Sequence, residues 1–162
     1  MARDRVLFQR GDDFRTLDTW GLVLCEAPIQ LMSDVKEPYK NDWPDEHGDE
    51  EWADVLYYQS YELELTMAIR SVLLNTTAVE VRAFVEWLAA GEFMLWVEHG
   101  NLGRQKVRYA GYEDDAHMWK QKIRSGGNDR DEWVLKFKIK LKVNDPVTRV
   151  FPNATYTGLR VM

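Results

Sequence analysis

With 162 residues, of which 45% are hydrophobic and 30% are charged, the chain has the size and composition of one globular domain. Its single cysteine, Cys25, excludes an intrachain disulfide and a cysteine-based metal cage, and its apolar neighbours predict a buried, inert thiol. The net charge of −6 argues against nonspecific nucleic-acid binding, which needs a basic surface. The sequence has no signal sequence and no apolar stretch of the roughly 18 residues that span a membrane, so we expect a protein kept in a cytoplasm or packaged into a particle assembled there.

The first part of the chain is predicted to be extended. Residues 1–15 are expected to form a tail, followed by a strand over residues 19–25 and shorter extended pieces over 29–31 and 35–39. Pro, Gly and Asp residues then indicate a loop or hairpin tip over residues 41–52.

This loop carries the acidity of the whole protein. Residues 42–54, here called the acidic loop, contain no Lys or Arg, and without their seven acidic side chains the chain would hold 20 acids against 21 bases. The acidic residues are Asp42, Asp45, Glu46, Asp49, Glu50, Glu51 and Asp54.

A long strand and one helix are predicted next. Residues 57–70 alternate with period two, placing Tyr61, Leu63, Leu65 and Met67 on one face and Glu62, Glu64 and Thr66 on the other. Thr77 and Glu80 fit a capping box, and an apolar stripe follows at helical spacing. We therefore predict a helix over residues 78–90, closed by a left-handed cap at Gly91.

The last third of the sequence predicts a hairpin and a final strand. Strands over residues 93–97 and 105–112 form the hairpin, and the polar residues 113–131 are expected to be a mobile connection, with 118–123 as a candidate helical turn. The final strand, residues 133–143, alternates strictly between apolar residues and lysines. The lysine row consists of Lys136, Lys138, Lys140 and Lys142.

Together these elements predict an α+β, mainly β fold. We expect an antiparallel β-sandwich or barrel-like core with one flanking helix (residues 78–90) and a protruding hairpin or loop. The whole chain, residues 1–162, is expected to be a single domain whose core spans about residues 19–146, with residues 147–162 as a second tail.

The sequence contains no pattern that predicts an active site, a cofactor site or a metal site. If Gly48 took the glycine position of an EF-hand loop, Trp43 and His47 would stand where calcium needs oxygen ligands, so only adventitious calcium binding stays open. The histidines are far apart and lack metal-ligand spacing, and phosphate-binding loops and nucleophile elbows are missing from the sequence. We therefore predict that the protein is not an enzyme.

The distinctive surfaces are instead suited to contact with other molecules. The lysine row is either the solvated face of an antiparallel strand or a charged face that meets Glu62 and Glu64 or a neighbour's acidic loop. The predicted subunit-interface residues are Trp43, Pro44, Asp45, Glu46, Asp49, Glu50, Glu51, Trp52, Lys136, Lys138, Lys140 and Lys142.

The order of these features resembles the amino-terminal domain of phage distal tail proteins, the hub components that join the tail tube to the tail tip. The matching features are the loop Asp42–Gly48, the strand around Tyr61–Leu65 and the terminal strand with its stop, Phe137–Pro146. The resemblance extends from about Trp20 to Pro146, which is most of the chain. Many relatives add a carboxy-terminal carbohydrate-binding-like domain, which this chain is too short to hold.

The resemblance implies a β-sandwich with a flanking helix and a protruding hairpin, six copies of which form a ring around the DNA passage of a phage or prophage tail. Implied partners are further copies of the chain and the tail tube and tail-tip proteins, with DNA only as passing cargo and no membrane. The implied location is the virion, assembled in the bacterial host cytoplasm. The alternatives are a tail tube or tail-terminator-like subunit, or a small ligand-binding β domain unrelated to phages.

Overall fold

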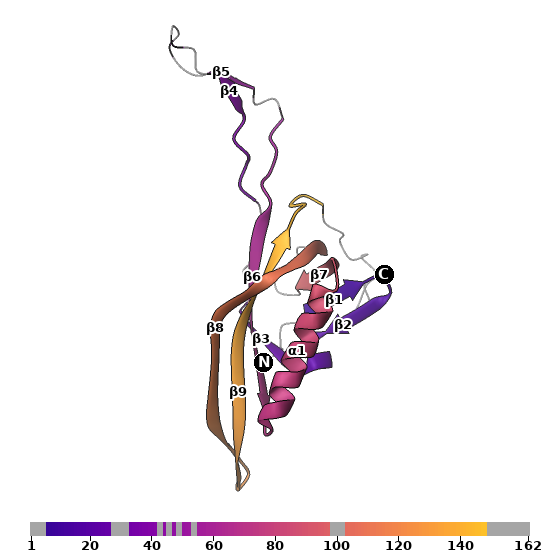
Figure 1. The fold of residues 1–162 in the computed structure, drawn as a ribbon, viewed down its shortest axis with the longest axis vertical. Coiled ribbons are helices and arrows are strands. Elements are labelled where there is room, and N and C mark those ends of the chain that lie inside the picture. Colours follow the sequence, from indigo (N-terminus) through magenta and orange to yellow (C-terminus); the bar gives the residue numbers. More distant parts are fainter. Residues whose placement is uncertain are drawn as a thin grey trace.

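A computed structural model of the chain describes residues 6–26, 33–41, 44, 47, 50–52, 55–97 and 103–148 (Figure 1). Most of this part of the chain is antiparallel β-sheet, and it contains a single α-helix, so the predicted mainly β, α+β class is confirmed. The elements in chain order are β1 (Val6–Arg10), β2 (Asp13–Thr16), the short 3-10 helix η1 (Leu17–Trp20), β3 (Leu22–Glu26), β4 (Tyr39–Asn41), β5 (Glu50–Trp52), β6 (Tyr61–Ser71), α1 (Leu74–Ala89), β7 (Phe93–Val97), β8 (Gln105–Ser125) and β9 (Asn128–Val143).

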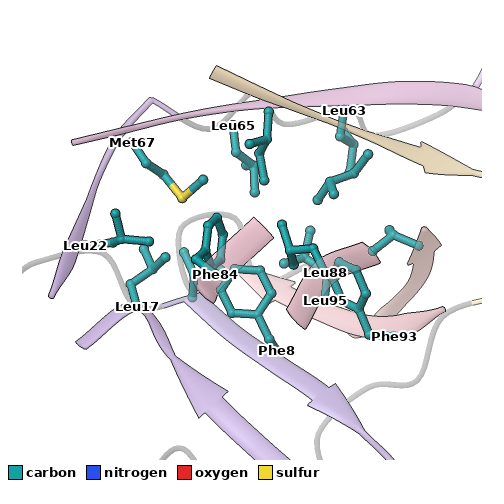
Figure 2. Close-up of a cluster of buried hydrophobic side chains, with 14 of the residues drawn as sticks. Phe8, Leu17, Leu22, Leu63, Leu65, Met67, Phe84, Leu88, Phe93 and Leu95 are labelled. Atoms are coloured by element: carbon teal, nitrogen blue, oxygen red, sulfur yellow. The ribbon is translucent and has the colours of Figure 1, made fainter. Parts of the chain in front are cut away.

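Seven of the strands form one sheet in the order β2-β1-β7-β8-β9-β6-β3. The long strand β8 belongs to both halves of this sheet, because residues 105–107 pair with β7 whereas residues from Arg108 onward pair with β9. The half formed by β1 and β7 faces the half formed by β6 and β9, and their inward side chains belong to one hydrophobic core (Figure 2). The arrangement is therefore that of a sandwich made from a single continuous sheet.

The helix α1 contributes the centre of this core. Phe84 is completely buried, and its ring centroid lies 5.7 Å from that of Phe8 in β1, 4.9 Å from that of Trp20 in η1 and 6.4 Å from that of Phe137 in β9. Leu88, one turn further along the helix, is also completely buried. Because Phe84 contacts both halves of the sheet, it fixes the helix between them (Figure 2).

The helix begins and ends differently from the sequence prediction. It starts at Leu74, and the predicted capping box is wrong, because Thr77 is buried inside the first turn, where its hydroxyl donates to the Leu73 carbonyl at 3.4 Å. The N-cap residue, Leu73, has no side-chain cap. At the other end Ala90 is the cap in right-handed conformation, and Gly91 follows at φ 147°, outside the predicted left-handed helical region. Tertiary burial of Thr77 outweighs its local capping preference.

The amino-terminal residues belong to the sheet. The expectation of an extended tail is wrong for residues 6–15, because Val6, Leu7 and Phe8 are buried in β1, which pairs with both β2 and β7. The strand predicted over residues 19–25 is partly wrong as well. Its first residues lie in η1, and β3 begins only at Leu22.

The largest difference concerns the predicted mobile connection over residues 113–131. In the structure β8 continues to Ser125, pairs with β9 as far as Ser125 opposite Asn128, and contains no helical turn at 118–123. Gly126 and Gly127 form the two-residue turn, with φ values of 56° and 90° that a hairpin of this length requires. Backbone pairing and cross-strand charges stabilise this hairpin. Because its strands do not depend on an apolar face, the sequence has no apolar alternation that would have predicted them.

A second hairpin projects from the amino-terminal end of β6, far from the tip of the β8–β9 hairpin (Figure 1). Here β4 pairs with β5, and Val35 pairs with Tyr58 closer to the sheet. The described residues between 33 and 60 are called the arm, and they correspond to the predicted protruding hairpin. The extended piece predicted at 29–31 lies outside the described residues, as do residues 149–162.

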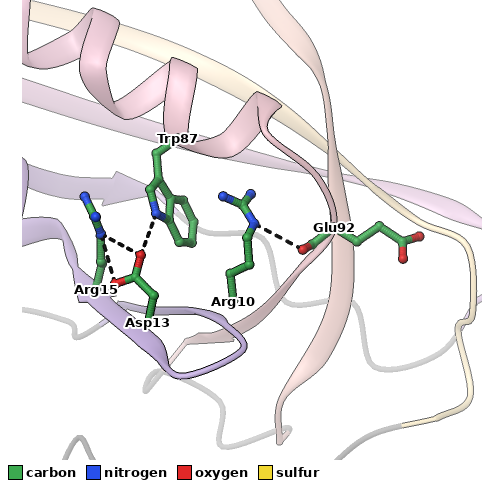
Figure 3. A network of polar contacts seen from close by, with 5 residues as sticks. All are labelled: Arg10, Asp13, Arg15, Trp87 and Glu92. Carbon is green, nitrogen blue, oxygen red and sulfur yellow. Dashed lines mark hydrogen bonds and ion pairs between the residues drawn. The ribbon is translucent and has the colours of Figure 1, made fainter.

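A polar network ties the end of α1 to the β1–β2 hairpin (Figure 3). The Arg10 guanidinium stacks 4.2 Å from the centroid of the Trp87 ring and donates to the Gly91 carbonyl at 2.9 Å. Asp13 accepts a hydrogen bond from the Trp87 indole nitrogen at 3.0 Å and pairs with Arg15 at 3.1 Å. The carboxyl end of the helix is therefore held by residues more than 70 positions away in the chain.

Replacing Phe84 by Ala is expected to destabilise the protein strongly. The Phe84 ring contacts aromatic rings of β1, η1 and β9, so its removal leaves a cavity between α1 and these three elements. Such a change typically lowers the unfolding free energy by about 3–5 kcal/mol. Val79→Ala, at an exposed position of the same helix, is the control and should change it by no more than about 0.5 kcal/mol. Chemical denaturation measures both, and similar losses in the two variants would contradict the assigned core.

The Asp13 carboxylate should make stability depend on acidic pH. Hydrogen bonds from Trp87 and then from Arg15 hold the pKa of Asp13 below its ordinary value. Since the folded-state pKa is lowered, the stabilisation is complete above the ordinary pKa of about 3.9 and is lost as the pH falls through the lowered value. The difference in unfolding free energy between the wild type and Asp13→Asn should therefore shrink below about pH 4, measured by urea denaturation across a pH series.

A Trp87→Phe background provides the control for this prediction. It removes the donor that lowers the Asp13 pKa most, so the effect of Asp13→Asn should depend less on pH there. An identical pH dependence in both backgrounds would show that the Trp87 hydrogen bond does not act on Asp13.

Candidate subunit interface

The predicted interface residues fall on two separate surfaces. On the arm, Pro44 and Glu51 are exposed, and Glu50 and Trp52 lie in β5 opposite β4. Four predicted residues of the acidic loop lie outside the described part of the chain, namely Trp43, Asp45, Glu46 and Asp49. The other surface is the lysine row, which lies on the outer face of β9.

The lysine row is half-buried and faces glutamates of the neighbouring strand. In the register between β6 and β9, Glu62 lies opposite Lys142 and Glu64 lies opposite Lys140. The ammonium group of Lys138 is 3.5 Å from the Glu64 carboxylate. The expectation that these glutamates meet lysines across the sheet is therefore confirmed. On the β8 side of β9, Glu113 lies opposite Lys138 and Arg108 lies opposite Lys142, so three glutamates stand against five basic residues and this part of the face is basic.

Further along the same strand, a buried carboxylate was missed by sequence reasoning. Glu132 is only 4% exposed, and its carboxylate lies 2.8 Å from the Arg130 guanidinium and 3.9 Å from that of Arg70. A buried charge requires such partners because leaving water is costly. Residue 132 lies between the predicted connection, 113–131, and the predicted strand, 133–143, so sequence reasoning had no basis for a buried glutamate there.

The structure does not bring the described residues of the acidic loop and the lysine row together within one chain. The arm leaves the sheet at Tyr61 and projects away from it, whereas the lysine row follows β9 back along the body (Figure 1). A contact between these two surfaces therefore requires a second copy of the chain. Their role as an interface stays a prediction.

The arm exposes hydrophobic side chains as well as acidic ones. Val55, Leu56 and Tyr57 are consecutive and are 64%, 53% and 67% exposed. Val35, on the other strand of the arm, is 40% exposed. A two-stranded hairpin is only marginally stable by itself in water, so an arm with this apolar surface is suited to contact with another molecule.

An apolar groove lies between α1 and the β8–β9 hairpin. Its volume is about 460 Å³, and its apolar lining comes from both sides, whereas Arg82 and Glu86 form an ion pair of 2.9 Å among its lining residues. The lining residues are Ala78, Val81, Arg82, Val85, Glu86, Tyr112, Ala116, Leu135 and Phe137. The sequence shows the helical stripe but not that it faces β8, because residues 113–116 were predicted to be a loop.

The other candidate groups do not form a reactive site among the described residues. His47 and His117 are both exposed on different elements, and His99 lies outside the described residues. No group of three or more His, Cys, Asp or Glu residues that could hold a metal ion occurs in the described ranges. No helix in the described ranges is long and apolar enough to cross a membrane.

The prediction of a buried cysteine is wrong. Cys25 is exposed at a β-bulge of the edge strand β3, because the pairing with β6 shifts between Leu24 and Glu26 and leaves the residue between them unpaired. Partial desolvation of the thiol still raises the pKa of Cys25, and Glu26 raises it further against an opposing effect of Lys136. The raised pKa keeps the thiol largely protonated, which lowers its reactivity.

Comparison with known proteins yields a similarity of fold. No protein-family model matches the sequence, and no curated protein matches it. The mainly β fold with one helix is similar to that of a solved structure, the Dit protein of SPP1, which is described as a paradigm of the hub adsorption apparatus in phages that infect Gram-positive bacteria. The TM-score is 0.60 at 11% sequence identity, and the similarity covers 90% of this chain and 51% of that protein. The chain thus spans about half the length of SPP1 Dit.

Reversing the charge of Glu64 is expected to destabilise the sheet. Glu64→Lys places a like charge beside Lys138 and opposite Lys140, which should lower the unfolding free energy by about 0.5–1 kcal/mol, less at high salt because exposed charges are screened. The control, Glu64→Gln, removes the attraction without adding repulsion and should cost less. Equal, salt-independent losses in urea denaturation would contradict this electrostatic interpretation.

Proposed function

We propose that the protein is a structural subunit of a phage or prophage tail, where six copies form a ring at the junction of tail tube and tail tip. The observation that carries this proposal is the fold similarity to SPP1 Dit, which covers 90% of the chain at a TM-score of 0.60. The sequence resemblance to the amino-terminal domain of distal tail proteins supports the same assignment. The protein then acts in the virion, with DNA as passing cargo.

The distribution of surface groups supports assembly through the arm. The arm carries exposed Val55, Leu56 and Tyr57 and projects beyond the sheet, where it is available to a neighbour (Figure 1). It also carries part of the acidic loop, whose charge is complementary to a basic face on a neighbouring subunit. Complementary charges favour the correct orientation of two subunits more than they add affinity.

A contact between the arm of one copy and the body of the next can build a ring. The arm and the body are different surfaces of the same chain, so an arm-to-body contact joins copies head to tail and not through one shared patch. Such a heterologous contact closes into a ring when the rotation between neighbours divides a full turn. The proposed partners at the two faces of the ring are the tail tube and tail-tip proteins.

Native mass spectrometry of the purified protein tests the proposal. We expect a six-copy assembly, formed by the protein alone or on addition of a tail tube or tail-tip partner. Replacing Trp43 and Trp52 together by Ala should lower the hexamer fraction, because aromatic residues are frequent anchors of interfaces. The control variant, with Phe at both positions, keeps aromatic side chains and should retain the ring.

Two outcomes would contradict this assignment. A protein that stays monomeric with and without tail partners would overturn the ring. An unchanged hexamer in the double Ala variant would leave the ring in place but exclude the acidic loop from its interface.

A further inference from the structure

The groove between α1 and β8 has the character of a docking surface. Its floor is formed by Val81, Val85, Leu135 and Phe137, and Ala78 stands exposed at its helical wall. The polar residues among its lining, Arg82 and Glu86, neutralise each other in an ion pair. An occupant must therefore be mainly apolar where it lies on this floor.

The apolar surface continues beyond the groove towards the tip of the β8–β9 hairpin. Leu74 lies one helical turn before Ala78 on the same stripe and is 40% exposed. Met118 is paired with the groove residue Leu135 and is 47% exposed. An extended apolar peptide segment would thus find contact along the helix and along β8.

The same face of β8 becomes basic past Met118. Alternation along the strand places Lys120, Lys122 and Arg124 on the face of Met118, and all three are exposed. The opposite positions on β9 include Asp131 and Asp129, of which Asp131 pairs with Lys120 at 3.1 Å. Three cations against two carboxylates leave this end of the docking surface basic.

The arm places an apolar segment next to an acidic one, which complements the apolar groove and its basic neighbour. The exposed apolar run Val55–Tyr57 follows directly on the acidic loop, which contains seven carboxylates and no Lys or Arg. An apolar segment with an acidic neighbour matches an apolar groove with a basic neighbour. The match selects one direction of docking, with the acidic end lying towards Lys122 and Arg124.

The arm cannot reach the groove of its own chain. Phe137, on the groove floor, pairs with Met67, six residues along β6 from Tyr61, which corresponds to about 20 Å of strand. From Tyr61 the arm projects in the opposite direction, away from the body (Figure 1). The chain's own arm is therefore excluded as the occupant of the groove, and an arm bound there must belong to another copy.

We propose that Val55–Tyr57 of one copy docks into the α1–β8 groove of the next copy. This contact rests on the proposed function, because it is the head-to-tail contact from which the ring would be built. It assigns the groove to a second copy of this chain and identifies the face of α1 that is buried in the assembly.

Disulfide cross-linking between two single-cysteine variants tests the contact. Both variants carry Cys25→Ser, and one adds Leu56→Cys on the arm while the other adds Ala78→Cys at the groove wall. The matched control replaces Ala78→Cys by Ala83→Cys, an equally small and exposed position of α1 that does not line the groove. The variants are mixed under oxidising conditions, and the native mass is recorded in parallel with tail partners present.

The expected result is a covalent dimer from the Leu56→Cys and Ala78→Cys mixture and only background amounts from the control mixture. If hexamers form but the two mixtures give equal or no cross-linking, the groove contact is wrong while the proposed function stands. If the protein stays monomeric under all of these conditions, the proposed function and the groove contact are both wrong.

Discussion

The structure depends on the register of β9. This strand pairs with β6 from Tyr61 opposite Val143 to Ser71 opposite Trp133, and with β8 from Arg108 to Ser125 on its other side. Because side chains alternate along a strand, this one register sends Phe137 and its apolar neighbours into the core and the lysine row to the outer face. A shift by a single residue would bury lysines, so the hydrophobic core and the basic surface are two results of the same pairing.

The helix α1 packs between the two halves of this sheet and forms one wall of the groove. Phe84 fixes α1 between the two halves of the sheet, and the contacts of Arg10 and Asp13 with the end of the helix hold its carboxyl terminus. Between Ala78 and Glu86, α1 faces β8 across an apolar groove instead of a filled core. The groove is thus a consequence of how the helix is anchored, and it lies beside the middle of β6, where Phe137 pairs with Met67.

The accuracy of the sequence prediction follows the strength of apolar periodicity. The alternation predicted the buried faces of β6, of β7 and of β9 from Phe137 to Val143, because each has one side in the core. Nearer the start of β9 the prediction is wrong, because Glu132 and Val134 are buried whereas Trp133 and Leu135 are half-buried. The second half of β8 has polar residues on both faces and is held by pairing with β9, so it gave no such signal. The start of α1 was misplaced because Thr77 is buried inside the helix, and the exposure of Cys25 depends on a bulge in β3.

The sequence by itself determined the mainly β class, the position of the single described helix, the two faces of β9 and the concentration of acid in one loop, since all of these follow from local periodicity and composition. Only the tertiary structure decided that the described residues of the acidic loop lie on an arm that points away from the body, and that α1 and β8 leave an apolar groove between them. The reason is physical: a groove and a projecting arm are defined by the distance between elements far apart in the chain, and local sequence patterns carry no information about that distance.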